Sequence, residues 1–267
     1  NPLCDEVIIN VGFDDPDCKK DDGTYDYLRG HFSGEKYKFL KSYWDPEVTK
    51  GGLILSQQTN IALQACEGKY CQYIQGDETI HEDDLPQVEA GIKKLEQNKD
   101  VEGLVFKYLH FFGNVDTYKY TRNIYRREMR LFKNKKGLVS VGDAQSFKHA
   151  DGSKPLCFLS DAKIMHYGWA RKSTIMKAKV QSFDKLYHGK DYKGSNEFEY
   201  QRMWGLKRFE GTHPIVMQKW IAENKNDLDV LKLKLNFTVK DLGLVFSDLI
   251  ESATGYRMGE YKSYRLI

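Results

Sequence analysis

Apolar and polar positions along the first hundred residues predict alternating strands and helices. A continuous apolar run at 7–11 is typical of a buried strand in a parallel sheet, and 37–44 suits a second strand. Between them, the stretch 13–24 is rich in Asp, Gly and Lys and predicts a loop, and 25–31 predicts a short helix. This alternation favours an α/β fold over a helical bundle.

The next elements continue the same order. A Gly-Gly pair at 51–52 opens a predicted helix, and 70–75 predicts a strand that leads into acidic residues. Apolar residues three and four positions apart over 85–95 then predict an amphipathic helix, with Asp83 or Asp84 as its cap and a proline in its first turn.

Later strands are predicted from shorter apolar runs, at 104–109, 127–132, 137–141 and 162–166. The runs at 127–132 and 137–141 are expected to form a hairpin around 133–136. After Arg171 the pattern is mostly helical and polar, and a further helix is predicted at 214–225. Because no flexible linker is visible, we expect a catalytic core over 1–171 and a mostly helical C-terminal extension, 172–267, packed on it.

Composition and charge exclude several classes of protein. The 267 residues are 40% hydrophobic, enough for a sizeable core. With 41 basic and 38 acidic residues, no basic patch of the kind that binds nucleic acid is indicated. No apolar run approaches the roughly 18 residues of a membrane span. Five cysteines without a CxxC pair favour reduced thiols and a cytoplasmic protein.

One acidic pair indicates chemistry. Asp77 and Glu78 directly follow a predicted strand, and ligands of open α/β sheets bind at the carboxyl ends of strands. Carboxylate oxygens there suit Mg²⁺ or Mn²⁺ held together with substrate phosphates. Taken alone, such a pair is more often a solvated surface feature.

The run Tyr73-Ile74-Gln75-Gly76-Asp77-Glu78 resembles the acidic metal-binding motif of family-2-type glycosyltransferases of GT-A fold, with Gln75 in place of the first acid. Further segments resemble the same family in the same order along the chain: 5–12 with 22–24, Gln57-Gln58-Thr59-Asn60, Asp143-Ala144-Gln145, His166-Tyr167-Gly168-Trp169-Ala170-Arg171, 210–214 and 255–261. The segment at 166–171 is similar to the late HYGW-R segment of a bacterial and archaeal branch. Gln58 departs from the arginine usual at its position.

The resemblance implies a GT-A-type, Rossmann-like mixed sheet flanked by helices, and a sugar transfer that inverts the anomeric carbon. The implied donor is a UDP-, GDP- or dTDP-sugar, and the acceptor a glycan, a lipid-linked molecule or a protein. The implied donor contacts are Asn10, Asp22, Gln57, Asn60 and Asp77. Since the family begins with a strand and helix ahead of this point, it also implies that residues precede Asn1.

For the metal, Mn²⁺ or Mg²⁺, the expected ligands are Asp77 and His166, with a purely structural histidine as the alternative at 166. Asp143 is the expected general base, because inversion needs a carboxylate to take the proton of the acceptor hydroxyl. The alternative for Asp143 is a turn residue. Glu78 is a second catalytic candidate, and Glu128 a reserve base.

Two other functions stay open on the sequence. A nucleotidyltransferase on a related sheet would also use acids at a strand end and a metal. A non-catalytic carbohydrate-binding protein would fit the replacement of an acid by Gln75. Arg126, Arg127 and Arg130 are expected to include at least two residues of a solvated strand face.

Overall fold

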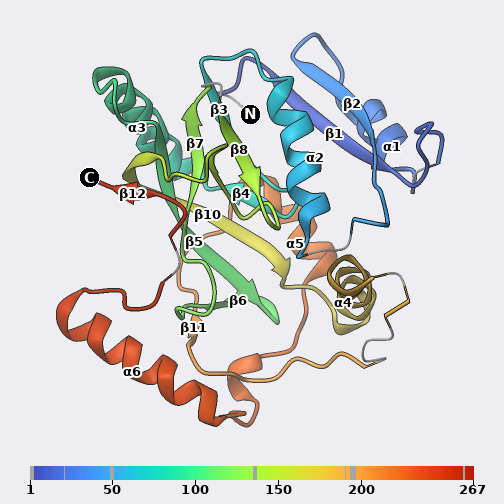
Figure 1. Cartoon of the computed structure of the whole chain (residues 1–267). Coiled ribbons are helices and arrows are strands. Elements are labelled where there is room, and N and C mark those ends of the chain that lie inside the picture. The colour runs from blue at the N-terminus through green and yellow to red at the C-terminus, as the bar shows by residue number, and fades with distance from the viewer. Residues whose placement is uncertain are drawn as a thin grey trace. The chain divides into compact units, whose positions relative to one another are not determined.

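A computed structural model describes residues 3–20, 22–48, 51–134, 137–189, 191–192, 197–260 and 262–267 (Figure 1). The fold is α/β, as predicted, and the chain divides into two compact units. Unit 1 comprises Asn1–Gln72, Leu131–Pro155 and Gln181–Gly194. Unit 2 comprises Tyr73–Arg130, Leu156–Val180 and Ser195–Ile267. Each unit is built from three stretches, and none of their boundaries falls at residue 171.

The first elements of unit 1 confirm the predicted pattern. The strands β1 (Val7–Phe13) and β2 (Tyr37–Tyr43) pair in parallel, and α1 (Thr24–His31) lies between them in sequence. Parallel pairing needs such a crossover connection. The helix α2 (Leu53–Gln64) starts after Gly52 and packs on both strands. Its side chains at Ile54 and Ser56 are buried there.

Strand pairing in the rest of unit 1 differs from the prediction. The strand β8 (Leu138–Val141) pairs with β9 (Ser146–His149), so the hairpin expected between 127–132 and 137–141 is wrong. The end of β7 (Arg127–Lys133) pairs instead with β3 (Tyr70–Gln72), which stops three residues earlier than predicted. Residues 135 and 136 of the expected turn lie outside the described residues. Pairing depends on distant segments, which local apolar patterns do not specify.

Unit 2 contains a mixed sheet. Its strands are β4 (Glu78–Ile80), β5 (Gly103–Phe112), β6 (Asn114–Lys119), β10 (Leu156–Trp169), β11 (Leu206–Arg208) and β12 (Arg265–Leu266). They follow the order β11-β6-β5-β10-β12, with β4 also paired to β10 and β7 to β5. The two long strands β5 and β10 run parallel, whereas β4, β6 and β11 are antiparallel to their neighbours.

The helix α3 (Leu85–Gln97) confirms the amphipathic prediction, because Val88 and Leu95 are fully buried against β10. Its N-cap residue is Asp84, one of the two predicted, although the Asp84 side chain makes no capping hydrogen bond. The short helix η1 (Glu82–Asp84) precedes α3 and is capped by His81, whose ring accepts a hydrogen bond from the Asp83 amide. The Asp84 carboxylate accepts instead from the Lys163 amide at 2.8 Å.

Three further helices lie after Trp169: α4 (Ser173–His188), α5 (Gln218–Asn224) and α6 (Val239–Thr254). Within the described part of the chain, no helix is both long and apolar enough to cross a membrane. All five cysteines carry free thiols.

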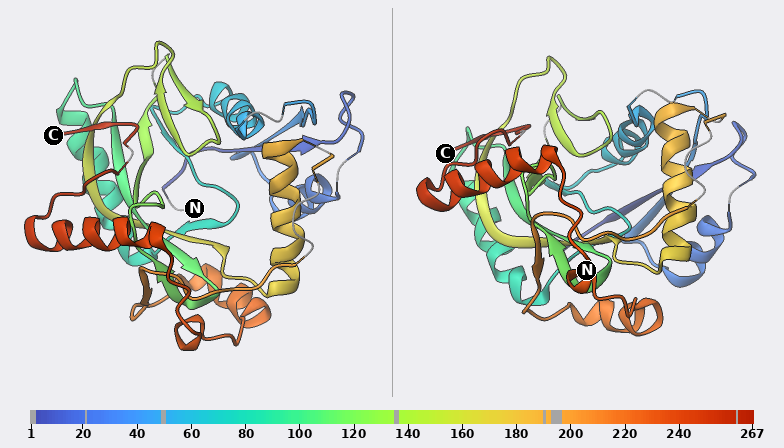
Figure 2. Two further views of the ribbon diagram at one scale, coloured as in Figure 1. Left: turned by 60° about the horizontal axis from the view of Figure 1, so that its bottom comes forward. Right: turned by 90° about the horizontal axis from the view of Figure 1, so that it is seen from below.

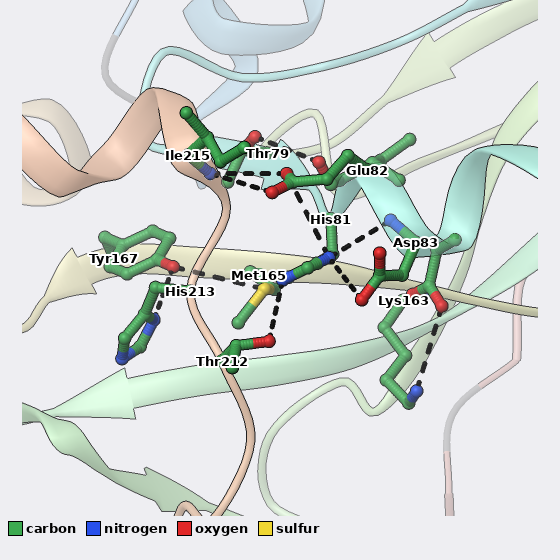
Figure 3. A network of polar contacts seen from close by, with 12 residues as sticks. Thr79, His81, Glu82, Asp83, Lys163, Met165, Tyr167, Thr212, His213 and Ile215 are labelled. Carbon is green, nitrogen blue, oxygen red and sulfur yellow. Dashed lines mark hydrogen bonds and ion pairs between the residues drawn. The ribbon is translucent and has the colours of Figure 1, made fainter.

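A polar network fixes residues 212–215 to the start of η1 within unit 2 (Figure 3). The Thr212 hydroxyl and the His81 Nε2 atom are 3.0 Å apart, and the Ile215 amide donates to Glu82. The Tyr167 hydroxyl contacts the His213 ring at 2.8 Å. His81 therefore has a structural role at both ring nitrogens.

The expected solvated face at 126–130 is wrong for two of its three arginines. Arg126 and Arg130 are 3% and 0% exposed. Both are paired with carboxylates from distant parts of the sequence, Arg126 with Glu251 and Arg130 with Glu78. These buried charges are tolerated because each arginine has a carboxylate partner.

Candidate functional site

The candidate site of unit 2 is centred on Asp77, in the turn that precedes β4. The carbonyl of Asp77 accepts a hydrogen bond from the Tyr167 amide at 2.8 Å, which joins this turn to β10. Strand register then places three residues in one row across the sheet. His166 of β10 lies opposite His110 of β5 on one side and opposite Glu78 of β4 on the other.

The carboxylate of Asp77 and the ring of His166 meet in this site. The Asp77 Oδ1 and His166 Nε2 atoms are 3.5 Å apart. The Asp77 side chain is 20% exposed and that of His166 9%, so the pair is largely shielded from water. Two residues 89 positions apart, both expected from the sequence to bind metal, are thus brought together.

The hydrogen bonds of His110 indicate which ring nitrogen of His166 donates to it. His110 Nε2 lies 2.6 Å from the Tyr125 carbonyl, which only accepts, so Nε2 carries the proton. Burial, followed by the charge of His166, lowers the pKa of His110 well below its usual value, and its ring is neutral. Its Nδ1 therefore accepts from His166 Nδ1, 3.1 Å away. His166 therefore donates through Nδ1, and its Nε2 is the ring atom that faces Asp77.

Lys179 of α4 adds a positive charge to the same site. Its Nζ donates to Asp77 Oδ2 at 2.9 Å and to the Gly168 carbonyl at 3.1 Å. Burial opposes ionisation of Asp77, but the interactions with His166 and Lys179 outweigh it and hold the pKa of Asp77 well below its usual range. Asp77 is therefore an anion at every physiological pH.

Gly168 allows β10 to pass beside these groups. A Cβ atom at this position would lie 2.5 Å from Asp77 Oδ2 and 2.8 Å from His166 Nε2. No side chain fits at those distances without displacing Asp77 from His166. The glycine of the HYGW-R segment is thus explained by the space that the Asp77–His166 pair needs.

Glu78 has a positioning role beside Asp77. Its side chain is fully buried, and Oε1 accepts from the Tyr108 hydroxyl at 2.9 Å and from Arg130 at 3.2 Å. The other oxygen accepts from the amide of Gln75 at 3.1 Å. These contacts hold the turn that carries Asp77 and direct the Glu78 carboxylate inward. The reserve base Glu128 is also fully buried, on β7.

The donor set fits a divalent ion shared with a substrate. Among the described residues, no group of three or more His, Cys, Asp and Glu side chains is arranged to hold a metal. Asp77 and His166 offer one oxygen and one nitrogen, and Gln75 adds no carboxylate. Mg²⁺ and Mn²⁺ commonly take few protein ligands and complete their shell with water and phosphate oxygens.

In unit 1, the amides expected to contact the donor bind the protein itself. Asn10 Nδ2 donates to the side chain and carbonyl of Gln58, both at 3.0 Å, and the Ser42 hydroxyl donates to Asn10 Oδ1 at 2.9 Å. Asn60 makes two bonds to the backbone of Ser140, at 2.7 and 3.0 Å. These five residues connect α2 to β1, β2 and β8.

The remaining predicted residues of unit 1 lie at the surface. Asp22 is exposed and accepts a hydrogen bond from the Thr24 amide at the start of α1. Gln57 is exposed on α2. Asp143 is exposed and accepts from the Tyr187 hydroxyl at 3.3 Å. Its role as a general base stays a prediction.

The surroundings of Asp143 are closely packed. A Cβ atom on Gly52, at the N-terminus of α2, would lie 2.9 Å from the Asp143 Cβ atom and 3.1 Å from the Tyr187 oxygen. Burial, followed by the charge of Asp143, raises the pKa of Tyr187 to about 12. The phenol therefore stays protonated and can donate to the carboxylate.

Sequence reasoning missed Lys179, and it gave His110 only a structural or acceptor-side role. Their contribution depends on strand register and on the path of α4, and neither residue belongs to the motif at 73–78. Trp169 and Arg171 follow His166 closely in sequence. Arg171 stacks on Trp220 at 5.7 Å, and Trp169 packs beside Phe112.

Comparison with known proteins adds no relative. No protein-family model matches the chain, and no curated protein matches it.

Proposed function

We propose that this chain is a glycosyltransferase of GT-A type, related to family 2, which moves a sugar from a nucleoside-diphosphate sugar to an acceptor hydroxyl with inversion. The observation that carries the proposal is the Asp77–His166 pair, 3.5 Å apart where β4 joins β10 in the mixed sheet of unit 2. The resemblance of the motif at 73–78 and of the segment at 166–171 supports it.

The roles of the residues follow from their charges. Asp77 and His166 would hold Mn²⁺ or Mg²⁺, and the ion would offset the negative charge that develops on the leaving diphosphate. Lys179 places an ammonium group beside the same carboxylate and would bind a phosphate oxygen as a second cation. His110 would hold the His166 ring by accepting from its Nδ1, an orientation in which Nε2 faces Asp77.

The first test is calorimetric titration of UDP, GDP and dTDP, each with Mn²⁺ and with excess EDTA. We expect at least one nucleotide to bind more tightly with the metal, and Asp77→Asn to remove this difference. A matched control is Asp161→Asn, because Asp161 is an exposed carboxylate of the same unit that is paired with Lys107. Equal affinity with metal and with EDTA in the wild-type protein would refute a metal-bridged donor site.

The products separate the other functions. A glycosyltransferase releases a nucleoside diphosphate as it transfers the sugar. This transfer is slow when water is the acceptor and faster with the true acceptor. A nucleotidyltransferase would form the donor sugar from a nucleoside triphosphate and a sugar phosphate. A carbohydrate-binding protein would do neither. We expect Mn²⁺-dependent release of the nucleoside diphosphate, and its loss in Asp77→Asn.

A further inference from the structure

The helix α6 has its apolar side turned to solvent. Surface helices normally bury their apolar stripe and expose the polar one. In α6 the residues buried against unit 2 are Leu244 and Ser247. Four large apolar side chains on the opposite side are more than half exposed: Val239 at 83%, Leu242 at 56%, Phe246 at 59% and Leu249 at 63%. Figure 2 shows this helix in red.

Ion pairs and hydrogen bonds fix this orientation. Glu251 of α6 binds Arg126 at 2.7 Å, and the Arg126 side chain is only 2% exposed. One turn earlier, Asp248 accepts a hydrogen bond from the Trp204 indole at 2.8 Å. Turning α6 to bury its apolar side would break the Arg126–Glu251 pair and leave the buried Arg126 with Glu260 as its partner, which is unfavourable. The apolar side is therefore available to another molecule.

The spacing of the exposed residues is that of a helix-pairing seam. Val239, Leu242, Phe246 and Leu249 are separated by three, four and three positions, the a and d positions of two heptads. The flanking e and g positions are Gly243, Val245, Ile250 and Ser252, none of which is charged. Two copies of this seam can thus meet without repulsion between like charges.

The charges of α6 argue against a lipid surface as the partner. The helix carries Lys240 against Asp241, Asp248 and Glu251, a net negative charge. Helices that lie on membranes are rich in Lys and Arg, because cytoplasmic lipid surfaces are anionic. Pairing with a second copy brings two uncharged seams together and avoids repulsion from an anionic surface.

The available area matches an interface between proteins. Phe237 and Tyr256, just outside the two ends of α6, are 45% and 64% exposed. At about 100 Å² for each of these six side chains, the surface offers on the order of 600 Å², against roughly 800 Å² per partner in a standard interface. A groove of about 640 Å³ along α6, lined in part by Trp204, Leu235 and Leu249, adds to it.

We propose that α6 forms the interface of a homodimer, in which the helices of two copies pair antiparallel across a twofold axis between Leu242 and Phe246. The midpoint of the exposed seam lies there, so Val239 faces Leu249 and Leu242 faces Phe246 when the second copy is reversed. Antiparallel pairing also places the positive end of each helix dipole beside the negative end of the other. A twofold interface uses the same surface on both copies.

Sedimentation of the full chain is the first measurement. We expect a dimer for the wild type and a monomer for Leu242→Asp and for Phe246→Ser, each with an unchanged circular dichroism spectrum and unchanged nucleotide binding. The control is Val216→Ser, because Val216 is 75% exposed outside α6 and its loss should leave the dimer intact. A monomeric wild type overturns the proposal, whether or not that monomer binds vesicles of phosphatidylcholine and phosphatidylglycerol.

Crosslinking locates the axis. With a short bis-maleimide, Phe246→Cys is expected to give covalent dimers well above the wild-type level set by the native thiols. Val239→Cys should stay at that level, because residues five positions from the axis lie about 15 Å along the helices from their own copies in an antiparallel pair. Crosslinking of both variants would show a parallel pair, and crosslinking of neither would show that the dimer forms elsewhere. Either result overturns the proposed interface.

Discussion

The ring of His110 has both nitrogens committed within the protein. One donates to the Tyr125 carbonyl and the other accepts from His166, so the ring has no position left for a proton. Burial, followed by the charge of His166, keeps the pKa of His110 far below its usual value. A buried histidine that is held neutral makes the stability of the fold depend on pH.

The sign of this dependence follows from the two states. Above about pH 6.5, His110 is neutral in both the folded and the unfolded chain. Below that pH the unfolded chain binds a proton that the folded chain refuses, so stability falls as the pH falls. For His110→Gln we expect the free energy of unfolding to fall less steeply between pH 6.5 and the pKa of His110 in the folded state. The difference in slope from the wild type should reach up to about 1.4 kcal/mol per pH unit.

Urea unfolding at several pH values measures this slope. The control is His188→Gln, because His188 is exposed at the end of α4 and has no comparable burial. Equal slopes for wild type and His110→Gln would show that His110 takes up a proton in the folded state. The assignment of His166 Nδ1 as the donor to His110 would then lose its basis.

The helix α2 is attached to its neighbours by side-chain amides more than by a wide apolar face. Asn60 binds both the amide and the carbonyl of Ser140 on β8, and Gln58 is buried between β1 and β2. Each bond satisfies a polar group that would otherwise be buried without a partner. Removing one such residue leaves the other group unpaired.

For Asn60→Ala we expect the free energy of unfolding to fall by about 2 kcal/mol, because two buried backbone groups of Ser140 lose their partners. Chemical denaturation provides the measurement. Gln57→Ala is a matched change on the same helix at an exposed position and should cost less than about 0.5 kcal/mol. Similar losses in the two variants would show that the Asn60 bonds contribute nothing net.

Elements whose apolar residues recur at the spacing of a helix or a strand were predictable from the sequence. The strands with which they pair were not. The parallel strands β1 and β2 and the helix α3 follow from apolar spacing alone. The strand β6 was missed because its sequence, Asn114–Lys119, is largely polar. The pairing of β8 was assigned to the wrong neighbour because several nearby strands offer similar apolar residues.

The site was predictable only where a motif carried it. Asp77 and His166 belong to segments with a family resemblance, and the structure places them 3.5 Å apart. His110 becomes visible only once β5 and β10 are in register. Arg126 and Arg130 were expected in solvent because isolated charges are costly to bury, and their carboxylate partners come from remote parts of the chain.

Neither unit is a continuous piece of the chain. Six segments alternate between the two units, and the chain therefore passes from one to the other five times. Residues 181–194 complete unit 1 and residues 195–267 complete unit 2. Any cut near the middle of the sequence removes parts of both.

We expect a fragment of residues 1–171 not to fold, because it lacks one segment of unit 1 and the last segments of unit 2. Expression of this fragment, followed by limited proteolysis and near-ultraviolet circular dichroism, is the measurement. The full chain is the reference for both. A protease-resistant fragment with a native-like aromatic spectrum would contradict this expectation.

The alternation of segments also has a consequence for synthesis on the ribosome. Domains that are continuous in sequence can fold one after another while the chain is still being translated. Here the first strands, β1 and β2, emerge long before residues 181–194, which finish their unit. Apolar surface of both units therefore stays uncovered during most of elongation. Production of this protein should depend on chaperones that bind nascent chains, and on the rate of translation past residue 194.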